Sequence, residues 1–369
     1  MKTLVIGGTG PTGPAVVEGL LARGHQVSLL NRGTRPAPEI PASVERIVGD
    51  PHFEETLREA LGRRRFDLIV AMYGRVRFIA KVAVDHTERL ISVGGSPEFR
   101  GLWQPELLFP RGQQVPLPED APRVESEAEL KFGYLARITE DAVMAHHAAG
   151  DYAATHLRYP LIYGPRQPMP TEWWVMRRIL DGRRRIVLAD GGLTIFVRGF
   201  SENMAEALLL AVDRPEIAGG KIYNCGDVHQ FTIAQWAEII ADELGAELEI
   251  VSVPADLAYP ARDLTIRPRH SHHHLFDTHK IRAELGYADK APPVEAVRRT
   301  VRWYLQNRPA ETEEQKADYA VHYRTEDEMA RLFADFRDRL GAVEHVDRAF
   351  VHPYPHPVRP GMARDQRNR

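Results

Sequence analysis

A short apolar run at the start of the chain leads directly into a glycine-rich turn. The run covers residues 2–6, and Gly7, Gly10 and Gly13 follow at intervals of three before an apolar helix opens with Ala15. Glycines between a strand and a helix let the backbone approach a pyrophosphate closely, and the positive end of the helix dipole favours its negative charge. The turn therefore predicts a dinucleotide site built by Gly7, Thr9, Gly10, Pro11, Thr12 and Gly13.

The residues after the second predicted strand, 26–30, indicate which dinucleotide is preferred. Sites for NAD usually offer an acidic residue about 20 positions past the glycines, whereas this chain has Asn31 and Arg32, with Arg35 nearby. Asparagine does not repel a 2′-phosphate, and a guanidinium can pair with it and stack on adenine. We therefore expect NADP(H), with NAD(H) as the alternative; Arg32 could instead be an ordinary surface residue. Asp50, which follows a strand at 45–48, could accept from the adenine amino group.

Apolar runs and amphipathic segments alternate through the first 160 residues. Further strands are predicted at 67–71, 89–93 and 153–158, with helices at 53–61, 76–84 and 127–149. Strands and helices that alternate at this spacing predict an α/β fold with a Rossmann-type doubly wound parallel sheet and right-handed crossovers.

The pattern divides the chain into three parts. Residues 1–165 are expected to form the dinucleotide-binding domain, to which segments up to about 225 partly return, and 166–309 mainly a smaller C-terminal α/β substrate lobe. Residues 97–125 are rich in proline and glycine and have little periodicity, so we expect an active-site loop or lid there. In the extension 310–369, a capping box at Thr325 predicts a helix at about 326–340, followed by an extended or disordered tail.

Composition bounds the class of protein. The chain has 369 residues, 43% of them hydrophobic, which is enough for a well-buried core. Its single cysteine, Cys225, excludes an internal disulfide and fits a cytoplasmic setting. The formal net charge of −3 gives no general attraction to nucleic acid. No segment is long and apolar enough to predict a membrane span.

Further short motifs follow the glycine turn along residues 1–307. They are Gly49-Asp50, the run 157–166 (Leu-Arg-Tyr-Pro-Leu-Ile-Tyr-Gly-Pro-Arg), Asn203-Met204-Ala205-Glu206-Ala207, Tyr223-Asn224-Cys225-Gly226-Asp227, and Asp277-Thr278-His279-Lys280-Ile281 with Leu285-Gly286-Tyr287. In these motifs the chain resembles the extended short-chain dehydrogenase/reductases, specifically the NAD-dependent epimerase/dehydratase family and its atypical members. The resemblance implies a Rossmann-like cofactor domain, a C-terminal substrate lobe, and a homodimer paired through helices near 75–85 and 127–149.

The catalytic signature of that family, Tyr-x-x-x-Lys on the helix after the fifth strand, is altered here. Aligned on Gly133 and Glu140, the chain has Phe132 in place of the tyrosine and Ala136 in place of the lysine. A lysine one turn away lowers the pKa of the phenol, which exchanges a proton with the substrate oxygen, so both proton-handling groups are missing in this register. A second register starts from Tyr134, with Arg137 three residues later.

Other polar residues are candidates for the site. Ser96 stands where the family's substrate-orienting serine or threonine would be, and it could equally be a turn residue. Tyr163 and Arg166 match positions that line the cleft in relatives, although Tyr-Gly-Pro is also a structural turn. The run His270–His274 contains four histidines and no acidic residue, so we expect a role in a substrate loop or on the surface rather than a metal site.

These observations lead to one main hypothesis and two alternatives. We expect an NADP(H)-dependent oxidoreductase or epimerase-like enzyme that acts on a small hydroxylated, carbonyl or conjugated-alkene substrate with an altered proton donor. Reduction of a conjugated alkene suits a site without a strong acid, because water can protonate the resulting carbanion. The alternatives are a cofactor-binding protein without redox turnover, such as a sensor or assembly partner, and an RNA-binding protein like the atypical chloroplast stem-loop-binding relatives, against which the acidic balance argues.

Overall fold

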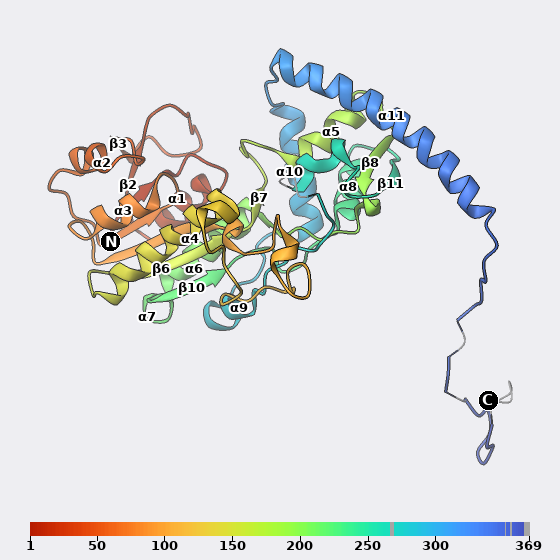
Figure 1. Ribbon diagram of the computed structural model, residues 1–369. Helices are drawn as coiled ribbons and strands as arrows, with labels where there is room; N and C mark the ends of the chain where they lie inside the picture. The colour runs from red at the N-terminus through yellow and green to blue at the C-terminus, as the bar shows by residue number, and fades with distance from the viewer. Residues whose placement is uncertain (266–268, 351, 355, 365–369) are drawn as a thin grey trace.

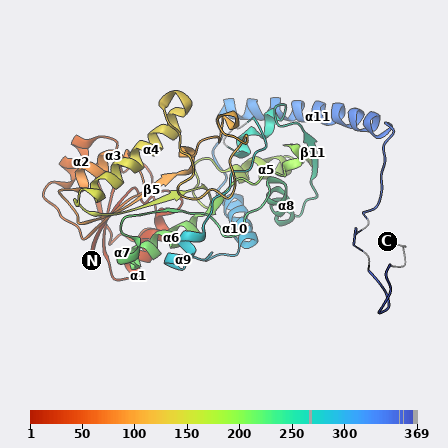
Figure 2. The same ribbon diagram turned by 60° about the horizontal axis from the view of Figure 1, so that its bottom comes forward.

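The computed structural model describes residues 1–265, 269–350, 352–354 and 356–364. Figure 1 shows a larger lobe that contains the N-terminus, a smaller lobe beside it, and a long helix that runs across the smaller lobe and past it. The same arrangement is seen after rotation in Figure 2. Among the described residues, no helix combines the length and the hydropathy needed to cross a membrane.

The larger lobe is built on a sheet of seven parallel strands. Their order is β10-β6-β5-β4-β1-β2-β3. The bounds are β1 Lys2–Ile6, β2 Gln26–Asn31, β3 Glu45–Val48, β4 Leu68–Ala71, β5 Arg89–Gly95, β6 Ala153–Tyr159 and β10 Lys221–Asn224. The chain adds β2 and β3 on one side of β1 and later strands on the other, so the doubly wound parallel sheet that we predicted is confirmed.

Helices cover both faces of this sheet because neighbouring residues of each strand point in opposite directions. Val5 packs on one face with the helices α1, α6 and α9, whereas Ile6 packs on the other with α2, α3 and α4. The bounds are α1 Gly13–Ala22, α2 Glu54–Leu61, α3 Val76–Ala83, α4 Glu127–Ala148, α6 Ser201–Asp213, α7 Pro215–Ala218 and α9 His279–Leu285.

The smaller lobe has its own apolar core. The helices α5 (Thr171–Leu180), α8 (Ile233–Glu243) and α10 (Pro293–Gln306) pack around the parallel pair β8 (Arg185–Ala189) and β11 (Glu249–Val253). A second short pair, β7 (Leu161–Tyr163) with β9 (Arg198–Phe200), was not predicted because three residues carry too little periodicity. The 3₁₀ segments are η1 Ser96–Glu98, η2 Pro105–Leu107, η3 Asp190–Gly192 and η4 Tyr259–Thr265.

The C-terminal helix is longer than the sequence indicated. We predicted a helix at about 326–340 from a capping box at Thr325, but α11 spans Glu313–Gly341. The capping box that starts it pairs Thr312 with Gln315, and the Thr325 hydroxyl instead donates to the Val321 carbonyl inside the helix. The segment thus contains two capping motifs, one at Thr312 and one at Thr325. The helix starts at the first because the turns that follow it pack on the smaller lobe. Residues 344–350 form no helix or strand.

Candidate active site

The glycine-rich turn folds tightly between β1 and α1. Gly7 and Gly8 have φ of 104° and 72°, and the Gly7 amide donates to the Leu30 carbonyl at 2.9 Å. A Cβ on Gly13 would lie 2.1 Å from the Gly8 carbonyl oxygen, so only a glycine at position 13 lets the start of α1 lie this close to the turn. Thr12 makes no side-chain cap hydrogen bond, so no side chain covers the positive end of the α1 dipole, which favours an anion there.

Gly10 differs from its two partners in the repeat. Its φ, like that of Gly13, lies outside the left-handed region, but no atom of the described residues comes within 4 Å of the position that a Cβ would take. Gly10 lines the pocket, and packing within the fold does not require a glycine there. A ligand that approaches the backbone at this point does require one.

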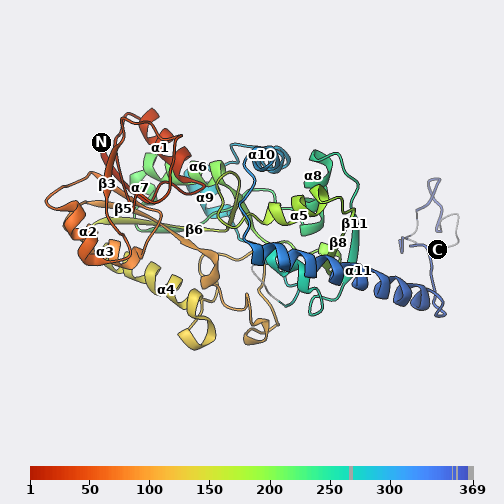
Figure 3. The ribbon, with the colours of Figure 1, turned by 90° about the horizontal axis from the view of Figure 1, so that it is seen from above.

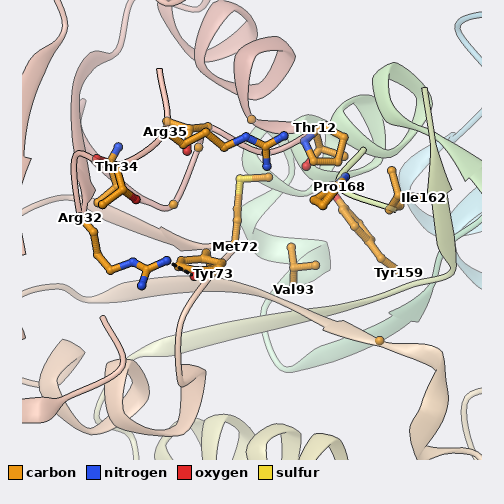
Figure 4. A pocket seen from close by; sticks show the side chains of 18 of the residues that line it. Thr12, Arg32, Thr34, Arg35, Met72, Tyr73, Val93, Tyr159, Ile162 and Pro168 are labelled. Carbon is orange, nitrogen blue, oxygen red and sulfur yellow. Dashed lines mark hydrogen bonds between the residues drawn. The ribbon is translucent and has the colours of Figure 1, made fainter. Parts of the chain in front are cut away.

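A pocket of about 560 Å³ opens over the turn (Figure 4). It lies at the carboxyl ends of β1, β2, β4, β5 and β6, at the point where the strand order reverses, which is where ligands bind in open α/β sheets. Its lining is Gly7, Gly8, Thr9, Gly10, Pro11, Thr12, Gly13, Asn31, Arg32, Gly33, Thr34, Arg35, Met72, Tyr73, Val93, Gly94, Gly95, Tyr159, Pro160, Ile162 and Pro168. The structure thus brings together every predicted cofactor-binding residue except Asp50.

One end of the pocket carries a basic and aromatic pair. The Arg32 guanidinium donates to the Tyr73 hydroxyl at 2.9 Å and lies 5.7 Å from the centre of its ring (Figure 4). Asn31 Oδ1 accepts from the Gly33 amide at 2.8 Å and so shapes the loop that presents Arg32. Among the residues that the structure describes, no acidic side chain lines this pocket.

Asp50 lies outside the pocket lining. It contacts His52, and the His52 ring in turn packs against Tyr73, which does line the pocket. The Asp50 carboxylate accepts from the backbone amide and from Nδ1 of His52, and these bonds lower the pKa of Asp50. The His52 ring meets Tyr73 edge-on at 5.0 Å. The role of Asp50 as an acceptor for the adenine amino group therefore stays a prediction.

Arg35 lines the pocket, and Arg166, which the sequence placed in the cleft, lies beside it without being a lining residue. Arg35 donates to the Arg166 carbonyl at 2.5 Å, and in Figure 4 its side chain extends toward Thr12 and Pro168. Arg166, at φ 69°, donates to Glu39 at 2.9 Å and to the Thr9 carbonyl at 3.3 Å. Burial and the neighbouring Arg166 charge lower the pKa of Arg35. Two guanidiniums with one carboxylate between them leave this rim electropositive.

At the opposite end of the pocket, the described lining residues offer no group that could donate a proton to a ligand. Its lining there is Val93, Gly94, Gly95, Tyr159, Pro160 and Ile162. The Tyr159 hydroxyl is buried and donates to the Met204 carbonyl at 2.6 Å, and burial raises the pKa of Tyr159 well above its usual value.

None of the predicted catalytic residues lines the pocket. Ser96 is buried in η1, and Tyr134 lies on the middle of α4 with the Arg137 guanidinium 5.4 Å from its ring. Tyr163 packs in the core of the smaller lobe against Phe200 and Trp236, and burial, with the nearby Asp227, raises its pKa well above the usual value. The structure thus places Tyr163 as a core residue.

The positions of the altered signature also lie away from the pocket. Phe132 is 65% exposed, and neither it nor Ala136 is among the lining residues. The helix is interrupted just before them, because Leu130 has φ −161° and ψ 101°. Gly133 lets α4 approach η1 closely, since a Cβ there would lie 2.3 Å from the Pro97 carbonyl oxygen.

A buried charged cluster lies behind the pocket floor, where His156 Nε2 packs against Gly94. Arg158 donates to both oxygens of Glu140, at 2.7 and 2.8 Å, and also pairs with Glu98. Burial alone would raise the pKa of Glu140, but the hydrogen bond from Arg158 and the nearby positive charges lower it. Burial and the Glu140 charge raise the pKa of Glu98 to about 8, and burial lowers that of His156 to about 4.

The histidine run, 270–274, forms hydrogen bonds with the loop 97–125, and neither segment lines the pocket. His270 bonds to the Leu102 carbonyl at 3.0 Å, and His274 bonds to Gln113 at 2.7 Å. Across the described part of the chain, no group of three or more His, Cys, Asp or Glu residues is placed to hold a metal ion. No residue of 97–125 lines the pocket, so the prediction that this loop covers the site is wrong for this conformation.

Sequence reasoning missed Met72, Tyr73 and Pro168. Met72 and Tyr73 directly follow β4, which is the parallel neighbour of β1, so the strand order would have placed them beside the glycine turn. Pro168 lies past β7 in an irregular segment, and no sequence signal indicated its place.

Comparison with known proteins agrees with this geometry. Residues 108–226 match the NAD dependent epimerase/dehydratase family. The structure of UDP-glucose 4-epimerase from Thermotoga maritima superimposes with a TM-score of 0.66 at 18% identity, covering 83% of this chain and 99% of that one. The chain is thus similar to the NAD-dependent epimerase/dehydratase family in sequence over residues 108–226, and it shares the fold of the epimerase.

Two further relatives extend this family comparison. dTDP-glucose 4,6-dehydratase from Bacillus anthracis, solved with NAD, gives a TM-score of 0.65 at 17% identity over 84% of this chain and 97% of that one. In sequence, the 3-diazoavenalumate denitrifying reductase of a Streptomyces species is 27% identical over 67% of this chain and 82% of its own length.

Proposed function

We propose that the chain is a nicotinamide-dependent reductase that prefers NADP(H) and acts on a small electron-poor substrate. The observation that carries the cofactor assignment is the open space at Gly10, because this glycine serves no packing need and lies in the pocket at the start of α1. The turn from Gly7 to Gly13 would hold the pyrophosphate. A bound nicotinamide would supply hydride.

The basic end of the pocket supports NADP(H) over NAD(H). Arg32 can pair with a 2′-phosphate, and the Tyr73 hydroxyl that it already contacts is a second donor. Arg35 and Arg166 add positive charge at the rim. A carboxylate that would bind the ribose hydroxyls and repel the phosphate is missing from the lining.

The other end of the pocket supports a reaction in which the protein donates no proton. Phe132 and Ala136 replace the proton-handling pair, and the Tyr159 hydroxyl is already bonded to a carbonyl.

Two substrate classes can be reduced without a proton from the protein. A conjugated alkene accepts hydride and is then protonated by water. A diazonium carbon forms a bond to the incoming hydride while the C–N bond breaks and its electron pair leaves with N₂, so no proton is needed. The name of the Streptomyces reductase favours the second class.

The substrate would occupy a second pocket of about 510 Å³ that meets the first at Pro168. Leu161, Met169 and Trp173 supply apolar surface. The segment before α11 adds Pro309, Ala310 and Glu311, and the first turns of α11 add Gln315 and Tyr319. The Trp173 indole donates to Glu311 at 2.9 Å, which fixes this segment against α5. A planar, mostly apolar molecule suits such a lining.

The test measures binding first and turnover second. Calorimetry with NADPH, NADP⁺, NADH and NAD⁺ should show tight binding of the phosphorylated pair, and absence of binding by all four would overturn the proposal.

Turnover is then measured as cofactor oxidation with an aldehyde, an enone and an arenediazonium salt. NADPH deuterated at C4 should place deuterium in the product, with the Gly10→Ala chain as the control for uncatalysed reduction. Turnover of the aldehyde alone would contradict the reaction class.

A cofactor-binding protein without turnover is the second candidate. The observation that favours it is the same lack of a proton donor among the described lining residues at the end of the pocket near Val93 and Ile162. If it is correct, NADP(H) binds but no substrate class oxidises it, and turnover by the wild-type chain would exclude it.

A further inference from the structure

A third cavity lies in the smaller lobe, between η4 and α11. Figure 3 shows α11 crossing this lobe beside α5 and β8, and the cavity lies where the first turns of the helix pass η4. Its volume is about 580 Å³, and its described lining is Tyr259, Arg262, Asp263, Arg269, Gln315, Asp318, Tyr319 and His322. We call it the η4–α11 cavity. All of these side chains carry a polar group, and all lie outside the stretch 108–226 that matches the epimerase/dehydratase family.

The spacing of the polar residues along α11 directs them to this cavity. The residues of α11 that line it follow one another at intervals of three or four, and they are Gln315, Asp318, Tyr319 and His322. At about 100° per residue they fall within an arc of roughly 100°. Glu326 lies one turn further along the same face and is buried in its ion pair with Arg178. That pair therefore fixes the rotation of the helix, and with it the side chains that face the cavity.

Several polar groups around the η4–α11 cavity have no partner among the residues that the structure describes. Arg262 Nε and His322 Nδ1 are buried and make no hydrogen bond, and the exposed Arg269 makes neither a hydrogen bond nor an ion pair. The guanidinium of Arg262 is held in place, because Nη2 donates to the Asp256 carbonyl at 2.8 Å and the group lies 4.4 Å from the centre of the Tyr259 ring. Buried polar groups normally find a partner, so groups left unpaired around one cavity are suited to a bound molecule.

The charges that line the cavity favour a small negative group. Arg262 and Arg269 present guanidiniums, whose planar N–H groups match the two oxygens of a carboxylate. Of the two acids in the described lining, Asp263 already interacts within the chain. Asp318 is exposed and makes no hydrogen bond or ion pair with a described residue, so it offsets one positive charge. The charge that remains suits a monovalent carboxylate better than a doubly charged phosphate.

The η4–α11 cavity adjoins the second pocket. Asp263, Gln315 and Tyr319 line both spaces, and the second pocket meets the cofactor pocket at Pro168. The three spaces thus follow one another, from the cofactor pocket through a mostly apolar pocket to a polar one. An elongated molecule can extend through the last two.

We propose that the η4–α11 cavity binds a carboxylate at the end of the substrate that is remote from the reacting carbon. The apolar part of the substrate would occupy the second pocket, and the reacting carbon would lie near Pro168. This inference rests on the proposed function, and it narrows the substrate class to elongated, planar carboxylates. Residues of η4 and of the C-terminal extension, rather than the cofactor-binding lobe, would make this selection.

Calorimetry on the full chain tests the proposal with cinnamate and its neutral counterpart cinnamamide, neither of which can be reduced without NADPH. Cinnamate should bind about tenfold more tightly, because hydrogen bonds to a charged group are stronger than those to a neutral one. Inorganic phosphate, which has no apolar part, should bind at least about tenfold more weakly than cinnamate. Equal affinities for cinnamate and cinnamamide, or for cinnamate and phosphate, would overturn the proposal.

Variants of two lining residues identify the groups that hold the carboxylate. Arg269→Gln should weaken cinnamate binding about tenfold without affecting cinnamamide, and Arg269→Lys should lose less because it keeps the charge. Asp318→Asn should strengthen cinnamate binding about two- to fivefold, because it removes a repulsion. The matched control is Arg324→Gln, an equal change of charge at an exposed position on the opposite side of α11, which should have no effect. Weaker cinnamate binding by Asp318→Asn, or unchanged binding by Arg269→Gln, would overturn the proposal.

Met169→Trp connects the cavity to the second pocket. Because Met169 lines that pocket, the larger side chain should weaken cinnamate binding several-fold, and unchanged binding would overturn the assignment of this carboxylate to the substrate. None of these readouts needs cofactor or turnover. Failure of the chain to bind NADP(H) would therefore contradict the proposed function while cinnamate still binds, whereas equal affinity for cinnamate and cinnamamide would overturn this inference with the cofactor site intact.

Discussion

Arg178 and Glu326 form an ion pair that is completely shielded from solvent. The guanidinium donates from Nε and Nη2 to one Glu326 oxygen, at 2.8 and 2.6 Å, and neither side chain is exposed. The guanidinium also lies 3.3 Å from the centre of the Trp174 ring. The pair joins α5 to α11 across almost 150 residues of sequence, so it holds the C-terminal helix on the smaller lobe.

Removing one partner of this pair should be far more damaging than removing an exposed acid. Glu326→Ala leaves the Arg178 charge buried without a counter-ion, and we expect a loss of about 3–5 kcal/mol in the free energy of unfolding. The control is Glu328→Ala on the exposed side of the same helix, where solvent screens the pair with Arg331 and its loss should change stability little. Urea unfolding measures both, and equal losses would contradict the assignment.

Gly10→Ala and Gly13→Ala should separate ligand binding from folding. An alanine at 10 meets open space, so the free energy of unfolding should stay the same or rise slightly, while NADP(H) affinity falls at least about tenfold because the methyl group occupies ligand space. An alanine at 13 would collide with the Gly8 carbonyl and should destabilise the fold itself. Calorimetry and urea unfolding measure the two effects. Undiminished binding by Gly10→Ala would remove the main support for the site.

Arg32→Ala should reduce the preference for the phosphorylated cofactor. A charged hydrogen bond contributes about 1.5–3 kcal/mol, so NADPH affinity should fall roughly 10- to 100-fold while NADH affinity changes little. Tyr73→Phe, which removes only the hydroxyl partner of Arg32, should have a smaller effect in the same direction. Arg63→Ala, at an exposed position outside the pocket, is the control. An equal fall for both cofactors would indicate that Arg32 does not contact the 2′-phosphate.

Met169→Trp tests the second pocket. Met169 is 73% exposed and lines that pocket, so a larger side chain should fill substrate space without disturbing the core. We expect KM to rise several-fold, with cofactor affinity and the free energy of unfolding unchanged. An unaltered KM would place the substrate elsewhere.

Glu98→Gln should change how stability depends on pH. The pKa of Glu98 is raised to about 8 by burial and by Glu140, so the folded chain keeps a proton that the unfolded chain releases above about pH 4.5. This contribution to stability is complete below pH 4.5 and is lost as the pH rises to about 8. Glutamine does not ionise, so the variant should match wild type near pH 5 and exceed it at pH 8.

The difference between the two chains should grow by at most ~1.4 kcal/mol per pH unit. Urea unfolding at several pH values measures it, and Glu125→Gln, at an exposed position, should give a curve parallel to wild type. A parallel curve for Glu98→Gln would show that Glu98 is ionised in the fold.

The sequence predicted what depends on local pattern. The glycine repeat identified the turn, and the alternation of apolar runs identified the parallel sheet, because both signals lie within a few neighbouring residues. Residues that depend on three-dimensional neighbours were harder to place. Tyr73 joins the pocket only because β4 lies beside β1, and Tyr163, which matched a family motif, turns into the smaller lobe against Trp236. Thr325 carried a capping motif that the longer helix overrides.

The contacts of Arg166 have a consequence for how the protein unfolds. This one side chain reaches Thr9, Pro36 and Glu39, so the segment that enters the smaller lobe is bonded to two loops, the glycine turn itself and the loop between β2 and β3. A ligand bound beneath these loops stabilises only the state in which they are assembled. Saturation with NADPH should therefore make the two lobes unfold in one cooperative transition. Calorimetric scans with and without NADPH would show this as a rise in the ratio of van't Hoff to calorimetric enthalpy.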